Sequence, residues 1–424
     1  MTSALQKFIV LAAGLLGAQA AFSGSFLIRN ATVHTMTAAG TLKSADILIT
    51  DGRIAALGAA LQAPQGAQVI DAGGQPVTPG LFGGLSHLGV EEIGLEPSAQ
   101  DYALKLGSMR PEFDVMLAFN PDSTSVAVNR LGGVTFGVVV PTAAAGATGA
   151  PGGTIIAGQG AAVTLDGAAL SGSRALFVEL GAAASALSGG SRAAQYMLLR
   201  QAFSEARTPN LVLASDQRLL TPAGRQALTE FSAGAAPIVF GVERAADIRQ
   251  VLAFAAREKL RIAIRGGAEA WRVAPELAAA RVPVILDPLD DLPESFDEVG
   301  ATLENAARLD RAGVRIAFSF ADPEPHNLRK LRQAAGIAVA HGLPWQAGLA
   351  AITRVPAEIF GVADRVGSIE TGRLANLVVW SGDPLEVTSV ARNVFISGKL
   401  EPQTSRQTEL RERYLERLRQ NAAR

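Results

Sequence analysis

One histidine in an apolar stretch carries the clearest sign of chemistry in this chain. The stretch reads TPGLFGGLSHLG, from Thr78 to Gly89, and opens on a Pro-Gly turn. Alternate residues of a strand face the same side, so Leu85 and His87 would share one face. Two histidines at this spacing would chelate a divalent metal, but Leu85 has no lone pair to donate. The stretch therefore holds half of a chelating pair.

The sequence offers few other metal ligands of the usual kinds. Its four histidines are His34, His87, His326 and His341, and it has no cysteine. The lack of cysteine excludes disulfides and thiolate metal sites. A zinc ion that activates water needs at least three protein ligands. Carboxylate oxygens, which suit a harder ion, are available nearby or at strand ends at Glu91, Glu92, Glu243 and Glu269.

The pattern of apolar and polar residues, which indicates the elements that must position His87, changes along the chain. Short strand-like runs fill residues 26–77, and similar runs return at 364–398. Between them, apolar strand-length runs alternate with helical patterns such as AADIRQVLAFAAREK. Strands that are apolar on both faces and alternate with helices are typical of parallel βα units, and about eight would make a TIM barrel. An open, doubly wound sheet is the alternative. The clearest predicted strands read GVTFGVVVP, NLVLAS, APIVFGV, LRIAIRGG, VPVILDP and GVRIAFSF.

These patterns predict an α/β chain, a (β/α)8 TIM barrel beside one small sheet domain built from both chain ends. The predicted parts are a signal peptide at 1–20, the sheet domain at 21–80 with 363–402, the barrel at 81–362 and a charged helix at 403–424. We expect the charges of that last helix to be solvated, with binding to a partner as the alternative.

The N-terminus predicts export. Lys7 precedes an apolar run that starts at Phe8, and Ala18-Gln19-Ala20 fits a cleavage site between small residues. The run is shorter than the ~20 residues of a spanning helix, so we expect no stable membrane insertion after cleavage. A secreted or periplasmic protein follows, and a buried N-terminal helix is the alternative. A net charge of −1 indicates no nucleic-acid partner.

A glycine-rich run, residues 143–167, lacks the Lys-Ser/Thr pair of a phosphate-binding loop. We expect it to form a long loop over the barrel mouth, able to act as a lid. Serine hydrolase chemistry finds no support either, because no Gly-x-Ser-x-Gly motif occurs.

Taken together, the motifs resemble the amidohydrolase superfamily, in particular its exported, imidazolonepropionase-like branch. The matching runs are DGRIAALG, VTPGLFGGLSHLG and AGLAAITRVPAEIFGVADRVGSIETGRLANLVVWSGDPL, in that order. The resemblance implies a (β/α)8 TIM barrel with a small composite β-sandwich domain built from both chain ends, and one or two divalent metals bound in the barrel. In that family the metal activates a water that attacks a C–N bond, usually a cyclic amide or a dipeptide amide.

The resemblance also implies where metal ligands should stand. The family's first strand ends in Asp-x-His-x-His, and the matching residues here are Gly83, Leu85 and His87. Its next two histidines fall at Phe240 or Gly241, and at Arg265 or Gly266. Its last ligand, an aspartate that also accepts a proton, falls at Asp322 or Ala321.

Candidate metal ligands are thus His87 and Asp322, with Asp322 also the catalytic candidate. Arg265 would place a fixed positive charge where a metal ligand is expected, so it is a candidate substrate-binding residue. The other two candidate substrate-binding residues are Arg244, at the start of a helix, and His326, in the loop that contains Asp322.

The predicted function is hydrolysis of non-peptide C–N bonds by an amidohydrolase whose catalysis is impaired, because its metal site is degenerate. The alternative is a pseudoenzyme, a non-catalytic protein that binds a small molecule on this scaffold. We expect no cofactor, or else one divalent ion of Zn, Mn or Fe. The expected partners are a small molecule in the barrel mouth and, in an oligomer, a second copy or an active homologue.

Overall fold

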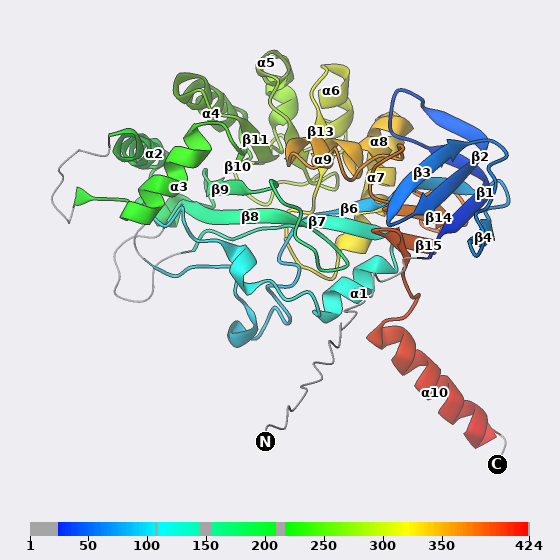
Figure 1. Ribbon diagram of the computed structural model, residues 1–424. Coiled ribbons are helices and arrows are strands. Elements are labelled where there is room, and N and C mark those ends of the chain that lie inside the picture. Colours follow the sequence, from blue (N-terminus) through cyan, green and yellow to red (C-terminus); the bar gives the residue numbers. More distant parts are fainter. Residues whose placement is uncertain (1–23, 107–108, 145–153, 209–216, 423–424) are drawn as a thin grey trace, which may run out of the picture.

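The structure is a computed structural model that describes residues 24–106, 109–144, 154–208 and 217–422. The chain forms two hydrogen-bonded sheets of eight strands each. We call the barrel sheet, around which helices pack and whose apolar core is the larger, the larger sheet, and the other the smaller sheet (Figure 1). The predicted signal peptide and the expected strand NLVLAS both lie outside the described residues.

The larger sheet is a nearly closed barrel in the order β13-β12-β11-β10-β9-β8-β7-β6. Its open edge is bridged where the Leu85 amide donates to Ser319 Oγ at 2.9 Å and the His87 amide donates to Pro323 O at 2.9 Å. The strands are β6 (Leu81–Ser86), β7 (Val134–Val139), β8 (Ile156–Thr164), β9 (Ala175–Glu179), β10 (Ile238–Val242), β11 (Ile262–Gly266), β12 (Val284–Leu286) and β13 (Ile316–Phe318).

Strand β8 departs from the expected series of parallel βα units. It runs antiparallel to both of its neighbours, β7 and β9, whereas the remaining pairs of this sheet are parallel. The prediction of a loop across residues 143–167 is therefore wrong over Ile156–Thr164, where all nine residues are buried in the sheet. Small residues read as a loop in the sequence, but here they let β8 fit between two other strands.

Helices pack mainly around the outside of the barrel, as Figure 1 shows for α4 to α6. Helix α4 occupies the stretch AADIRQVLAFAARE that the sequence predicts as helical, and buries Ile248, Val251 and Phe254. The helices are α1 (Thr124–Arg130), α2 (Arg192–Arg207), α3 (Pro222–Ser232), α4 (Ala245–Glu258), α5 (Ala274–Ala280), α6 (Asn305–Arg311), α7 (Leu331–Ala340), α8 (Trp345–Ala351), α9 (Arg354–Ile359) and α10 (Arg406–Ala422).

The smaller sheet combines strands from both ends of the chain, in the order β16-β15-β14-β5-β1-β2-β3, with β4 paired to β1. Its strands form one connected sheet around an apolar core of their own, which includes Ile28, Ile47 and Phe395. The strands are β1 (Phe26–His34), β2 (Thr41–Thr50), β3 (Arg53–Gly58), β4 (Gln68–Asp71), β5 (Pro76–Pro79), β14 (Leu377–Trp380), β15 (Ala391–Ile396) and β16 (Lys399–Leu400).

Trp380 and Arg332 hold the smaller sheet against the barrel. The Trp380 side chain is fully buried, its Nε1 donates to Thr78 Oγ1 at 2.9 Å, and the Arg332 guanidinium lies 5.3 Å from the centre of its ring. Arg332 also donates to the carbonyl groups of Pro384, Glu386 and Ser389. A buried guanidinium is stable here because neighbouring carbonyl groups accept from it.

Helix α10 projects away from the rest of the molecule (Figure 1). None of its residues is buried, as its charged composition predicts. Within the described residues, no helix has the length and apolar character needed to cross a membrane.

Candidate functional site

His87 lies just beyond the end of β6, at the barrel mouth where the carboxyl ends of the parallel strands meet. It is 5% exposed, and its ring stacks on Tyr102 with the ring centres 3.6 Å apart. Its Nδ1 lies 2.8 Å from Glu91 Oε2, and its Nε2 lies 2.9 Å from Thr142 Oγ1. Both ring nitrogens therefore have a partner within the protein.

The environment keeps the His87 ring neutral. Burial, with a smaller effect of the positive charge on Arg265, lowers the pKa of His87 to about 3. In a neutral ring only one nitrogen carries a proton. A carboxylate can only accept, so Nδ1–H donates to Glu91 and Nε2 accepts from the Thr142 hydroxyl. The lone pair that would bind a metal is thus used by Thr142.

Glu179, Gly241 and Arg265 form one row across β9, β10 and β11. Gly241 is in register with Glu179 on one side and Arg265 on the other. The Arg265 guanidinium reaches Glu179 Oε1 at 2.9 Å. A Cβ atom at Gly241 would lie 2.3 Å from Glu179 Oε2, so the carboxylate occupies the space above this glycine.

Glu243 stands in the same relation to Gly266. A Cβ atom at Gly266 would lie 1.9 Å from Glu243 Oε1, and Glu243 Oε2 accepts from the Ala268 amide at 2.9 Å. Burial raises the pKa of Glu243 to about 7, against the opposing effects of the Ala268 amide and Arg265. Gly241 and Gly266, two of the four residues at which the resemblance would allow a histidine, are therefore each covered by a glutamate.

A group of carboxyl groups extends from Glu243 along the mouth. Burial, together with the negative charges of Asp287 and Glu243, raises the pKa of Asp290 to about 8. Burial also raises the pKa of Asp287, although its oxygens accept from the amides of Leu289 and Ala321. Carboxyl groups near neutrality can exchange protons with a bound molecule.

The remaining predicted residues lie around the rim. Asp322 is exposed in the loop that follows β13, close enough to Glu91 and Tyr102 to affect the pKa of both. His326 is exposed, with its Nε2 at 3.3 Å from Glu324 Oε2. Arg244 binds Asp247 through two hydrogen bonds at the start of α4. The structure thus brings His87 and Arg265 into one electrostatic environment, and holds Arg244 and His326 on partners of their own.

The family's metal centre does not fit the donors present at this mouth. Across the part of the chain that the structure describes, no three His, Asp or Glu side chains are grouped so that they could hold a metal ion. Leu85 is buried in the ligand position of β6, and both nitrogens of His87 are hydrogen-bonded. We therefore derive no chemical step through a metal.

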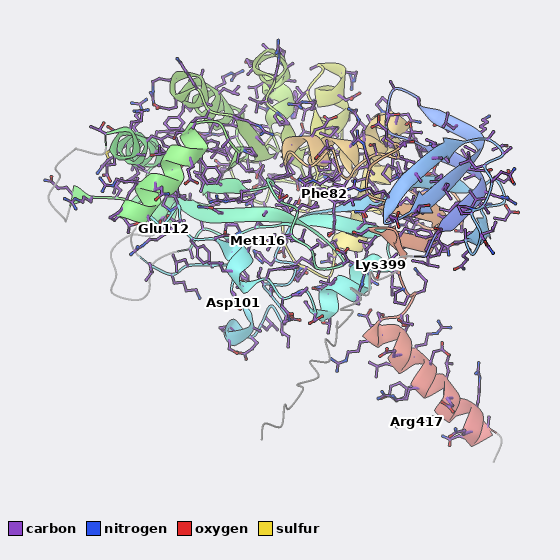
Figure 2. All side chains as sticks on the ribbon, viewed as in Figure 1. Phe82, Asp101, Glu112, Met116, Lys399 and Arg417 are labelled. Atoms are coloured by element: carbon purple, nitrogen blue, oxygen red, sulfur yellow. The ribbon has the colours of Figure 1, made fainter. Side chains whose placement is uncertain are left out.

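An apolar cavity of about 540 Å³ lies beside the segment that contains Tyr102. Figure 2 labels Asp101, Glu112 and Met116 on this segment, next to β8. Its apolar lining includes Leu104, Phe113 and Val115, and its charged lining is Asp101, Arg110, Glu112 and Asp114. An apolar hollow with a few charged groups is the usual form of a small-molecule site.

Comparison with known proteins agrees with this architecture. Residues 258–404 match the model of the Amidohydrolase family. This stretch is an Amidohydrolase family domain. Amidohydrolase tasK of Hapsidospora irregularis is 40% identical over 115 residues, which are 25% of this chain and 12% of that protein. The chain thus spans only about an eighth of the length of this curated relative.

Solved structures of amidohydrolases share the fold over most of the chain. An amidohydrolase from Thermotoga maritima MSB8 superposes with a TM-score of 0.78 and 25% identity, over 89% of this chain and 100% of that one. Phenylurea hydrolase B gives a TM-score of 0.53 with 14% identity, over 90% of this chain and 97% of that one. At that lower identity the likeness concerns the fold alone.

The sequence pattern locates His87 and Arg265 at the mouth but misses Glu179 and the contacts of Glu243 with Gly266 and Ala268. Glu179 ends the run ALFVE, which is short and apolar like the other strands. An acidic residue that directly follows such a run is the signal that would have found it, because strand ends meet at the mouth.

Proposed function

We propose that this protein hydrolyses a non-peptide C–N bond of a small molecule bound at the barrel mouth. The family match and the Thermotoga maritima structure support this reaction class. The observation that carries the proposal for this mouth is the position of Glu243 over Gly266, the residue that follows Arg265, with the pKa of Glu243 raised to about 7. A general base works best when its pKa lies near the working pH.

The chemistry requires a base, a stabilised oxyanion and a proton for the leaving nitrogen. Water would attack the carbonyl carbon while Glu243 takes one of its protons. Arg265 has five N–H donors, so it can pair with Glu179 and still donate to the oxyanion. Glu243 would then return the proton to the nitrogen as the C–N bond breaks, which gives a carboxylic acid and an amine.

His87 and Tyr102 would shape the binding site in this proposal. The neutral ring of His87, fixed by Glu91 and Thr142, forms a flat stack with Tyr102, which lies in the same segment as the cavity residues Asp101 and Leu104. An apolar group of the substrate fits this cavity better than a charged one, because Leu104, Phe113 and Val115 line it.

The second candidate is a non-catalytic protein that binds the same kind of molecule. The hydrogen bonds on both His87 nitrogens favour it, because they remove the ligand on which the family chemistry depends. Export of the mature protein, and its association with a second copy or an active homologue, remain parts of this proposal.

The deciding experiment measures hydrolysis of a panel of cyclic amides and N-acyl amino acids by the purified protein. We expect turnover that rises with pH around an apparent pKa of about 7. Glu243→Gln should lower kcat by about 10²–10⁴-fold, the usual contribution of a general base. Glu276→Gln, a matched change on the exposed surface of α5, should leave kcat unchanged.

Three further results would decide against parts of the proposal. Full activity in Glu243→Gln would rule out Glu243 as the base. Metal bound at one ion per chain, and lost on His87→Ala, would show that a rearranged metal site exists after all. No turnover on any substrate, with saturable binding at the mouth that Arg265→Gln abolishes, would support the non-catalytic candidate.

A further inference from the structure

Four arginines surround a groove at the end of the barrel opposite the mouth. Arg261 and Arg315 each stand one residue before a strand, β11 and β13 respectively. Arg281 ends α5 just before β12, and Arg354 begins α9. All four are exposed to solvent. Because they precede parallel strands or lie beside those starts, they gather at the amino ends of the strands.

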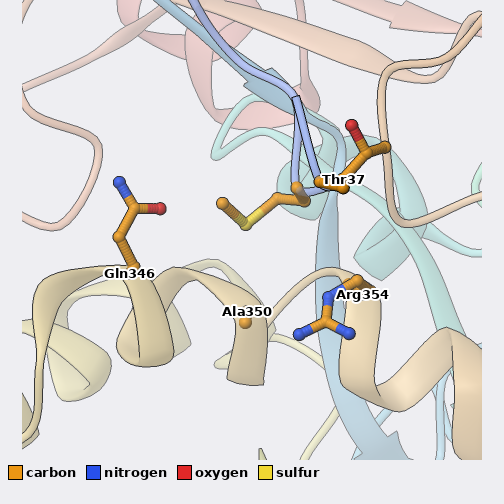
Figure 3. Close-up of a pocket in the computed structure, with 6 residues that line it drawn as sticks. Thr37, Gln346, Ala350 and Arg354 are labelled. Atoms are coloured by element: carbon orange, nitrogen blue, oxygen red, sulfur yellow. The ribbon is translucent and has the colours of Figure 1, made fainter. Parts of the chain in front are cut away.

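The groove consists of three adjoining hollows. The first, of about 390 Å³, lies between the smaller sheet and the barrel, and its lining includes Arg354, Gln346 and Thr37 (Figure 3). The second, of about 320 Å³, shares Arg354 and Gln346 with it and adds Arg315. The third, of about 270 Å³, shares Arg315 with the second and adds Arg261 and Arg281. The shared side chains make these hollows one continuous surface, which we call the arginine groove.

Positive charge in the arginine groove exceeds the negative charge that faces it. Glu358 lies between two of the arginines, 2.7 Å from Arg354 and 3.8 Å from Arg315. Among the described residues, no carboxylate lies within ion-pair distance of Arg261 or Arg281. Asp310, in the second hollow, is the other carboxyl group of the lining.

Two details show that these arginines are held near one another. Arg261 donates to Ile359 O at 2.8 Å, which fixes its guanidinium beside α9. Burial and the nearby charge of Arg315 both lower the pKa of Arg261. Like charges that repel each other in the free protein are stabilised when an anion binds between them.

We propose that the arginine groove binds a phosphate-bearing anion with more than one negative charge. Guanidinium groups match phosphate oxygens in a bidentate geometry, and their charge persists at every working pH. Arg261 and Arg281 supply guanidiniums whose charge no carboxylate among the described residues neutralises, while Arg315 and Arg354 extend the positive surface along the groove. The site lies at the opposite end of the barrel from Glu243, so it serves binding and not the hydrolysis proposed above.

Isothermal titration calorimetry with inorganic pyrophosphate at low salt tests the proposal. We expect saturable binding with one anion per chain, weakened as salt is added because the groove is exposed. Orthophosphate, with fewer charges, should bind more weakly. The double variant Arg281→Asn, Arg315→Ser should bind pyrophosphate at least tenfold more weakly. Asn is chosen at position 281 because it tolerates the left-handed backbone found there, with φ of 56°.

Two matched variants test whether the anion binds in the arginine groove. Arg249→Ser removes an exposed arginine that is paired with Glu276 on another face, and should change the Kd less than twofold. Arg265→Gln removes the arginine of the mouth, and should also leave binding intact. Absence of saturable binding, an equal loss in Arg249→Ser, or loss in Arg265→Gln alone would overturn the proposal. Unchanged circular dichroism and melting temperature of each variant show that it is folded.

Discussion

The Arg265 guanidinium and the Glu179 carboxylate lie 2.9 Å apart above Gly241. Their ion pair connects β11 with β9, two strands that β10 separates in the sheet. The glycine between them is a requirement of this pair, because the carboxylate fills the space of a side chain. The row explains why a histidine could not simply replace Gly241 on β10, because Glu179 would first have to move away.

Gly241→Ala should therefore destabilise the protein. The new Cβ would start 2.3 Å from Glu179 Oε2, so the carboxylate must shift and the ion pair must loosen. Overpacking of this kind costs about 1–3 kcal/mol of unfolding free energy, measured by urea denaturation. Gly58→Ala is the matched control, because its nearest neighbour, Leu61, would be 3.9 Å away. Equal stability of the two variants would argue against the row as described.

The pKa of His87 gives the stability a dependence on acidity. Its folded value of about 3 lies below the ordinary 6.5, so the unfolded chain binds the proton more readily between these values. Above pH 6.5, His87 is neutral in both the folded and the unfolded chain and does not lower the free energy of unfolding. As the pH drops from 6.5 toward 3, the free energy of unfolding falls by up to about 1.4 kcal/mol per pH unit. Denaturation of the wild type and of His87→Gln across this range measures the difference. Identical slopes would contradict a neutral, buried His87.

A direct view of the same proton comes from NMR. With four histidines in the sequence, their ring signals can be assigned by single substitutions. The His87 signal should not shift between pH 5 and 8, because its pKa lies near 3. A midpoint for His87 inside that range would show that the ring is more exposed to solvent than the stack on Tyr102 allows.

Glu243 should make the protein less stable as the pH rises, which is the opposite of the effect of His87. Its folded pKa of about 7 lies above the ordinary 4.5, so the folded state binds the proton more tightly. The stabilisation from its protonated form is present below pH 4.5 and is lost as the pH rises through 7. The free energy of unfolding of Glu243→Gln should therefore exceed that of the wild type by about 1–3 kcal/mol between pH 5 and 8. Glu409→Gln, on the exposed surface of α10, should gain nothing.

Arg332 should be essential to the contact between the smaller sheet and the barrel. Arg332→Met keeps much of the side-chain volume but leaves the carbonyl groups of Pro384, Glu386 and Ser389 without this donor. Unsatisfied buried groups cost about 1–3 kcal/mol each, so we expect a loss of at least 2 kcal/mol. Lys330→Met, at an exposed position two residues earlier, is the control and should stay within about 0.5 kcal/mol of the wild type.

Much of the fold could be predicted because its strands carry strong local signals. The runs at Ile238–Val242, Ile262–Gly266 and Ile316–Phe318 are rich in β-branched and aromatic residues, and they form β10, β11 and β13. Strand β8 could not be predicted in the same way. Its glycines and alanines have weak strand propensity, and its reversed direction depends on pairing with β7 and β9.

The site was predictable in position but not in composition. His87 and Arg265 stand at strand ends, and strand ends of a barrel meet at one mouth. The partnership of Glu179 with Arg265 depends on the register across three strands, which local sequence does not encode. Likewise, the neutral state of His87 follows from Tyr102, Glu91 and Thr142, which come from three different segments.

The smaller sheet has a consequence for the order in which the protein can be made. Strand β5 pairs with β14 through Pro79 and Leu377, so an early part of the chain completes its sheet with a late one. During translation, β1 to β5 leave the ribosome long before β14 exists and must wait with an open edge. A chain that stops before Leu377 would keep that edge exposed. Truncated products should therefore be captured by chaperones or aggregate, even where the barrel strands are complete.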